Sequence, residues 1–216
     1  MIQLHNRSVT RALIVDDDPE ARQSYEYIIE ELELDPLPVD GPLDNLPAFI
    51  KTIQPSDVLL CDYHLRLHNY ATCDGDELVA ECYKAKVPAV LCTTIADAVL
   101  RRDCLRYIPG LIKSGNPDPS QLVDGWDRCI TEMNGRFDPA RRPWRTLVRV
   151  AELDNQRQLV YVIVPPWDVR QKVPIETASL PPEIREHLVP DHRFHALVNT
   201  GADNHEDLFF ESWEPE

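Results

Sequence analysis

Basic residues are scarce in this sequence. Its 216 residues include 22 Lys and Arg against 37 Asp and Glu, which gives a formal net charge of −15. Proteins hold nucleic acids mainly through Lys and Arg side chains that neutralise phosphates, and anionic membranes attract the same side chains. We therefore expect neither nucleic acid nor a membrane among the partners of this chain.

Long apolar runs and paired cysteines are also absent. No stretch approaches the roughly 20 apolar residues of a membrane helix, and the polar segment 1–10 lacks the apolar core of a secretory signal. None of the six cysteines stands in a C-x-x-C pair, which argues against a zinc knuckle. Cys61 and Cys92 lie in apolar runs and are expected to be buried thiols. These absences predict a cytoplasmic protein without a disulfide framework.

Short apolar runs alternate with amphipathic segments between residues 9 and 135. Strands are expected at 11–15, 35–39, 57–61, 87–92 and 110–112, and helices at 19–32, 43–53, 76–85, 96–106 and 119–133. Nearly continuous apolar strands need cover on both faces, so this order predicts an α/β fold with a doubly wound five-stranded parallel sheet of the flavodoxin-like kind. Ligands of such sheets gather beyond the carboxyl ends of the strands.

The pattern changes after a segment rich in Pro, Arg and Gly. Strand-like runs follow at 146–153, 159–164, 170–175, 193–200 and 208–213, with a short helix at 182–188. This pattern predicts a small, mostly antiparallel β domain, either a barrel or a sandwich. The expected organisation is a first domain over residues 1–136, a linker over 137–145 and a second domain over 146–216.

Polar side chains follow four of the expected parallel strands. Asp16, Asp17 and Asp18 follow the first strand, Asp62 the third, Thr93 the fourth and Lys113 the fifth. Carboxylates about 4 Å apart repel by roughly 4 kcal/mol at an effective dielectric near 20, and a divalent cation relieves that repulsion. Mg²⁺ takes carboxylates together with a phosphoryl oxygen, and a carboxylate can then attack phosphorus to give an acyl phosphate. A lysine and a hydroxyl can hold the remaining phosphoryl oxygens.

A structural role for the same acids is the alternative. Asp17 and Asp18 precede an expected helix, where acidic side chains cap the first turn and favour the helix dipole. Asp62 would then be an ordinary residue at the end of a strand. The combination of all four elements in this order favours the phosphoryl site.

Four motifs together resemble the receiver domain of bacterial two-component response regulators, over about residues 9–135. They are Leu13-Ile-Val-Asp-Asp-Asp-Pro19, Leu59-Leu-Cys-Asp-Tyr63, Cys92-Thr-Thr94 and Ile112-Lys-Ser114. The resemblance implies that Asp62 accepts a phosphoryl group from the phosphohistidine of a histidine kinase or a phosphotransfer protein. It also implies that Mg²⁺ is held by Asp16, Asp17, Asp62 and the backbone carbonyl of His64. Thr93 matches the switch hydroxyl of the family, and Lys113 matches its phosphate-pairing lysine.

The sequence departs from the family pattern in three places. The loop from Asp62 to Gly75 is about five residues longer than usual, Ser114 replaces a proline, and Gly110 stands where an aromatic switch residue is expected. A phosphorylation-independent adaptor is therefore an alternative function. The long loop carries His64 and His68, but Mg²⁺ prefers oxygen ligands to imidazole. Such a loop can contact partners or gate access, or it can be a solvated insertion.

Asp16-Asp17-Asp18 also satisfies the Asp-x-Asp pattern of haloacid dehalogenase-like phosphatases. Asp16 would then be the nucleophile and Asp18 the general acid. Pro19 follows where that family has another residue type, and Asp62 would have no role. We therefore expect a phosphoacceptor signalling protein whose only activity is self-dephosphorylation, rather than a phosphatase.

The second domain offers no helix-turn-helix spacing, and its acidic residues outnumber its basic ones. Its four conspicuous aromatic residues are expected mainly to fill the core, although such side chains also suit protein recognition. They are Trp167, Phe209, Phe210 and Trp213. We expect this domain to engage a protein partner rather than a promoter, and a homodimer is compatible with this expectation.

Overall fold

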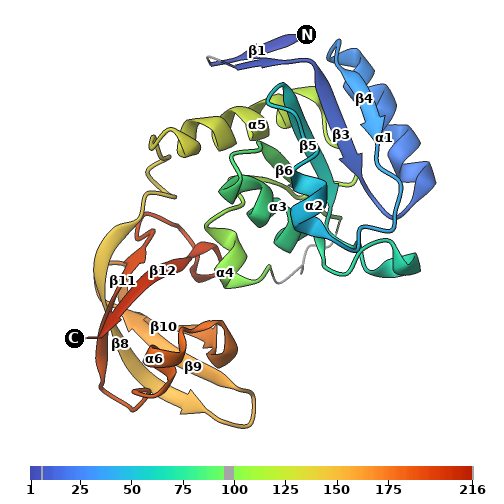
Figure 1. The fold of residues 1–216 in the computed structure, drawn as a ribbon. Helices are drawn as coiled ribbons and strands as arrows, with labels where there is room; N and C mark the ends of the chain where they lie inside the picture. The colour runs from blue at the N-terminus through green and yellow to red at the C-terminus, as the bar shows by residue number, and fades with distance from the viewer. Residues whose placement is uncertain (6, 95–99, 216) are drawn as a thin grey trace. The chain divides into compact units, whose positions relative to one another are not determined.

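The computed structural model describes residues 1–5, 7–94 and 100–215, and the chain divides into two compact units (Figure 1). The first unit comprises Met1–Leu100 and Tyr107–Arg136. The second comprises Arg101–Arg106 and Phe137–Glu216. Among the helices that the structure describes, none is long and apolar enough to cross a membrane.

A five-stranded parallel sheet forms the centre of the first unit. Its strand order is β4-β3-β5-β6-β7, and every neighbouring pair is parallel. The strands are β3 (Arg11–Val15), β4 (Asp35–Pro38), β5 (Asp57–Asp62), β6 (Ala89–Cys92) and β7 (Gly110–Ile112). Numbered along the sheet, this is the 2-1-3-4-5 order of the flavodoxin-like fold, so the predicted fold class is confirmed.

Helices cover both faces of this sheet. The helices α1 (Pro19–Glu31) and α5 (Pro119–Met133) share one hydrophobic core with the strands. Figure 1 shows α2 (Leu46–Ile50) and α3 (Gly75–Lys84) on the opposite face. Trp126 of α5 is fully buried and donates its indole N–H to the carbonyl oxygen of Leu59, 2.9 Å away. The side chain therefore ties α5 to the middle of β5.

Two elements of the first unit differ from expectation. A hairpin of β1 (Ile2–Leu4) and β2 (Arg7–Val9) precedes the sheet, and no expected strand covers it. Its His5 ring lies 2.6 Å from the hydroxyl of Thr131 on α5. The helix expected at 43–53 is limited to α2, because Asn45 caps it through the amide of Ala48.

The second unit is built on a five-stranded antiparallel sheet. Its order is β10-β9-β8-β11-β12, which confirms the predicted antiparallel β domain. The strands are β8 (Trp144–Asp154), β9 (Leu159–Val164), β10 (Asp168–Glu176), β11 (Arg193–Val198) and β12 (Phe210–Pro215). The first part of β8 pairs with β11 and its last part with β9, so one long strand joins the two halves of the sheet.

The core of the second unit lies on one face of this sheet. The short helix α6 (Pro182–Arg185) contributes the fully buried Ile184. Three of the four conspicuous aromatic residues, Trp167, Phe210 and Trp213, are partly buried and pack against this core, and Phe209 is fully buried outside the main cluster. A 3-10 turn, η2 (Thr177–Ser179), precedes α6, and another, η3 (His205–Asp207), precedes β12.

The helix expected at 96–106 is described only in its last part. Residues 95–99 lie outside the described residues, and α4 covers Arg102–Leu105. This short helix groups with the second unit, although its neighbours in sequence, Leu100 and Tyr107, belong to the first. Sequence patterning had placed the whole of this segment in the first domain.

We predict that Trp126→Phe lowers the free energy of unfolding by about 2 kcal/mol. The change removes a buried hydrogen bond and part of a fully buried side chain. Urea unfolding followed by circular dichroism measures the loss. The matched control is Trp144→Phe, since Trp144 is half exposed, and it should change the free energy by less than about 0.5 kcal/mol.

Candidate functional site

Three carboxylates meet at the carboxyl edge of the parallel sheet. Asp16 and Asp17 follow β3, and Asp62 is the last residue of β5, the neighbour of β3 in the sheet. One oxygen from each of these three side chains lies within 4.8 Å of the others. The predicted convergence of the acids therefore occurs, and parallel pairing is its cause, since it brings the carboxyl ends of both strands to one edge.

The three consecutive aspartates have different roles. Asp18 is exposed and caps α1, with its side chain accepting from the amide of Glu20 at 2.9 Å. Asp16 is 4% exposed and accepts from the amide of Asp18 at 2.8 Å. The guanidinium of Arg22, one turn into α1, donates to the carbonyl oxygen of Asp16. The capping alternative therefore applies to Asp18, whereas Asp16 and Asp17 belong to the carboxylate cluster.

Backbone groups hold Asp62 in place. Its carboxylate accepts from the amide of His64 at 2.7 Å, which folds the chain back at the end of β5. Gly75, the first residue of α3, donates its amide to the carbonyl oxygen of Tyr63 at 2.7 Å. A Cβ atom at Gly75 would lie 1.9 Å from the carbonyl oxygen of Asp62, so only glycine allows α3 to begin there.

Burial raises the pKa of two members of this cluster, Asp16 and Asp62. Burial raises the pKa of Asp16 from 3.8 to about 7, and the charges of Asp62, Asp17 and Asp18 add to this, against the amide of Asp18. Burial also raises the pKa of Asp62, opposed by the amides of His64 and Tyr63. At both Asp16 and Asp62, burial therefore outweighs the hydrogen bonds that favour the ionised carboxylate.

The donor set fits a magnesium ion. The three side chains offer only carboxylate oxygens, which are the ligands that Mg²⁺ prefers. Burial raises the pKa of Asp16, and the charges of Asp62, Asp17 and Asp18 add to this; a bound divalent cation would favour the ionised carboxylates. Asp16, Asp17 and Asp62 are therefore the residues able to hold the ion.

The remaining two candidates, Thr93 and Lys113, differ in where they lie. Thr93 follows β6, is 3% exposed, and donates its amide to the carbonyl oxygen of Ile112 at 3.0 Å. Lys113 is exposed and lines a cavity of about 180 Å³ with Gln121, Asp124 and other residues of β7 and α5. Within the part of the chain that the structure describes, no ion pair joins Lys113 to the three carboxylates. The end of a parallel strand predicts the edge of the sheet at which Lys113 lies, but it does not predict the direction of this long side chain.

The long loop after β5 folds against the site instead of extending into solvent. Its 3-10 turn, η1 (Leu67–Asn69), brings the His68 ring to 2.9 Å from the carboxylate of Asp17. Tyr70 donates its hydroxyl to the carbonyl oxygen of Val39 at 2.6 Å, and its own carbonyl oxygen accepts from the amide of Leu43 at 2.7 Å. These bonds attach the loop to the segment after β4.

A cleft of about 690 Å³ lies between the long loop and the segment after β4. Asp17 and Arg22 line it from the side of the carboxylates, and Asp40, His68 and Tyr70 line the rest. Sequence patterning identified the loop but not this cleft. The contact of His68 with Asp17 spans 51 residues and leaves no local signal in the sequence.

In metal-free buffer, we predict that the wild type loses stability relative to Asp16→Asn as the pH rises from about 4 to about 7. In this range Asp16 ionises in the unfolded chain but stays protonated in the folded one, because its folded pKa is about 7 against 3.8. The relative loss should reach about 2 kcal/mol, since water still reaches part of the site.

Urea unfolding at successive pH values in EDTA measures this difference. The matched control is Asp44→Asn, at an exposed position, whose difference from the wild type should stay flat with pH. A flat difference for Asp16→Asn as well would show that the folded protein does not raise the pKa of Asp16.

No family model matches the chain, and no curated protein matches it. Among solved structures, it is similar to the signal receiver domain of a modulated diguanylate cyclase from Desulfovibrio desulfuricans G20, at 21% identity and a TM-score of 0.46, covering 59% of this chain and 98% of that one.

Two further solved structures come from response regulators. One is the signal receiver domain of NarL from Mycobacterium tuberculosis, at 16% identity and a TM-score of 0.40, covering 60% of this chain and 99% of that one. The other is the response regulator StyR, at 14% identity and a TM-score of 0.44, covering 59% and 62%. The strand order of the first unit is, independently of these likenesses, that of the flavodoxin-like fold.

Proposed function

We propose that the first unit is a phosphoryl-accepting signalling domain. Asp62 takes a phosphoryl group from the phosphohistidine of a histidine kinase or phosphotransfer protein, and Asp16, Asp17 and Asp62 hold Mg²⁺. The observation that carries this proposal is the meeting of three carboxylates within 4.8 Å at the carboxyl edge of a doubly wound sheet. Phosphoryl transfer needs such a cation site beside a nucleophile.

In this proposal the carboxylate of Asp62 attacks phosphorus. A P–O bond forms to its oxygen as the P–N bond of the phosphohistidine breaks, and the imidazole leaves with the electron pair of that bond. When bound, Mg²⁺ neutralises charge on the phosphoryl oxygens. The amides of His64 and Tyr63 hold the carboxylate of Asp62 at the end of β5. The carbonyl of His64 is the fourth oxygen that we assign to the ion.

Thr93 and Lys113 would hold the phosphoryl oxygens. The hydroxyl of Thr93 would donate to one of them from the end of β6. Lys113 would pair with another from the end of β7. We assign the cleft beside Asp17 to the approach of the donor, because its lining includes one of the three carboxylates.

Two observations bear on the competing functions. Asp18 caps α1, and Asp62 rather than Asp18 completes the cluster, which disfavours a phosphatase with Asp18 as its acid. The position of Lys113 and the absence of an aromatic side chain at Gly110 favour the phosphorylation-independent adaptor as the second candidate. In either case we assign the second unit to a protein partner.

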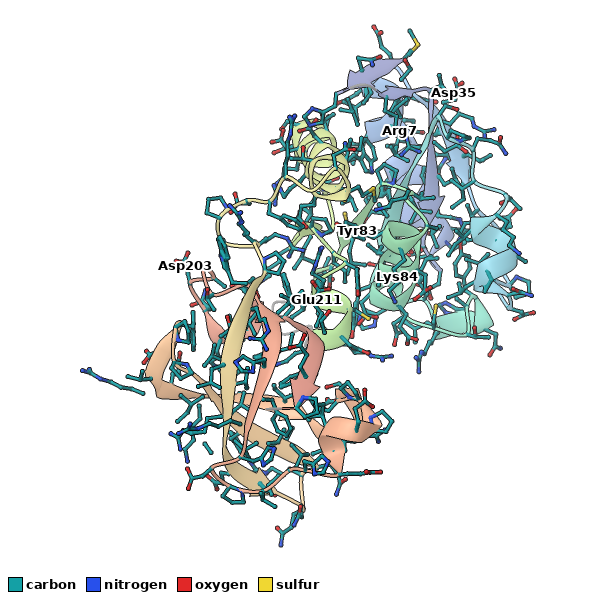
Figure 2. All side chains as sticks on the ribbon, turned by 60° about the vertical axis from the view of Figure 1, so that its left-hand side comes forward. Arg7, Asp35, Tyr83, Lys84, Asp203 and Glu211 are labelled. Atoms are coloured by element: carbon teal, nitrogen blue, oxygen red, sulfur yellow. The ribbon has the colours of Figure 1, made fainter. Side chains whose placement is uncertain are left out.

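Intact-mass spectrometry tests the proposal. After incubation with a small acyl phosphate and Mg²⁺, we expect one phosphoryl increment on the wild type and none on Asp62→Asn. The matched control is Asp35→Asn, an exposed acid at the amino end of β4 (labelled in Figure 2), whereas the site lies at the carboxyl ends of the strands; it should take the phosphoryl group like the wild type. An increment that survives Asp62→Asn would contradict the proposal. No increment on any variant, even with a phosphorylated histidine kinase as donor, would favour the adaptor.

A further inference from the structure

The segment Arg101–Arg106 is attached to the second unit from outside the main run of that unit. Residues 137–216 are continuous and supply every member of the hydrophobic core of this unit. No residue of the segment belongs to that core. The segment is therefore held to the second unit by contacts outside that core cluster.

Arg102 is the centre of this attachment. Its Nε donates to the carbonyl oxygen of Pro174 at 2.9 Å. Its Nη1 donates to the carbonyl oxygens of His205 at 2.7 Å and Leu208 at 2.9 Å. Burial lowers the pKa of Arg102, and the nearby charges of Glu206 and Asp207 oppose this. Three carbonyl oxygens thus accept from the Arg102 guanidinium.

The geometry of these acceptors suits a guanidinium group. Three carbonyl oxygens come from β10, η3 and the residue after η3, so they approach the cation from separate directions. A planar guanidinium presents donors in fixed diverging directions and stays charged, whereas a lysine ammonium is a compact point charge. These three carbonyl oxygens should therefore bind arginine in preference to lysine.

Arg106, one helical turn later, occupies a second subsite. Its Nε lies 3.2 Å from the carboxylate of Glu211, which Figure 2 labels on β12 near α4. Its guanidinium stacks over the ring of Phe137 at 4.9 Å and lies 5.6 Å from that of Phe209. The i, i+4 spacing places both arginines on one face of a helical turn.

The second unit also forms hydrogen bonds with the backbone of the segment. Arg141 donates to the carbonyl oxygens of Leu105 at 3.2 Å and Arg106 at 3.0 Å, at the carboxyl end of α4. These are carbonyls that a helix end leaves without partners, so the contact favours a helical turn as well as its side chains. Arg101, in contrast, pairs with Asp103 within the segment itself.

We propose that the second unit contains an arginine-recognition site whose resident occupant is Arg101–Arg106 of its own chain. The site takes a helical turn with two arginines four residues apart. When the resident segment leaves, a partner protein that presents the same arrangement binds in its place. This gives the second unit a partner of defined chemistry, and it does not depend on phosphoryl transfer in the first unit.

A labelled peptide tests the site in the full chain. The peptide carries residues 100–107 with Cys104→Ser to prevent oxidation, and fluorescence anisotropy measures its binding. The chain with Arg102→Ala and Arg106→Ala, whose site has lost its resident side chains, should bind the peptide at least tenfold more tightly than the wild type. The matched control is Arg101→Ala in the protein, which should behave as the wild type does.

The peptide itself provides the specificity test. Replacing its Arg102 by lysine should weaken binding to the emptied chain at least tenfold, because lysine cannot reach all three carbonyl oxygens. Equal binding of the arginine and lysine peptides, or no binding to an emptied chain that keeps its β-sheet circular dichroism, would overturn the proposal.

A measurement on the wild type covers the case in which the emptied chain does not fold. Excess peptide should compete with the resident segment and raise hydrogen exchange of the amides in 101–106, with the lysine peptide as control. If exchange in this segment is unchanged at peptide concentrations that saturate any binding, the segment is a fixed part of the second unit and the proposal is wrong.

Discussion

Repulsion among Asp16, Asp17 and Asp62 is the constraint on which the first unit depends. The parallel pairing of β3 with β5 brings their carboxyl ends together, and these ends carry the three acids. Burial raises the pKa of Asp16 to about 7, and the charges of the neighbouring acids add to this. The apolar strands stabilise the first unit, whereas the three carboxylates at the edge of its sheet are close together and repel one another. At this edge a cation would find carboxylate ligands.

The surrounding backbone keeps this group together. Asp18 caps α1 and donates its amide to Asp16, so one residue both begins the helix and holds a member of the cluster. Gly75 lets α3 begin against the carbonyl oxygen of Asp62. The long loop then adds His68 at the exposed side of Asp17. The site is therefore organised mainly by strand ends and helix beginnings, and the inserted loop shapes the cleft beside it.

The parts of this structure that sequence could predict are those set by local patterns. The apolar runs at 11–15 and 57–61 predict buried parallel strands, and the acids that follow them predict the cluster. The direction of Lys113, the contact of His68 with Asp17 and the attachment of Arg102 to the second unit have no local pattern. Each depends on segments far apart in the chain, and long polar side chains adopt their directions only after those segments have met.

Calorimetric titration of Mg²⁺ into the metal-free chain tests the central claim most directly. The account predicts one binding site per chain, affinity that increases as the pH rises towards 7 because Asp16 must lose its proton, and loss of binding in both Asp16→Asn and Asp62→Asn. Absence of binding up to tens of millimolar Mg²⁺, with an unchanged melting temperature, would contradict it, because a cation that relieves the repulsion must also stabilise the fold.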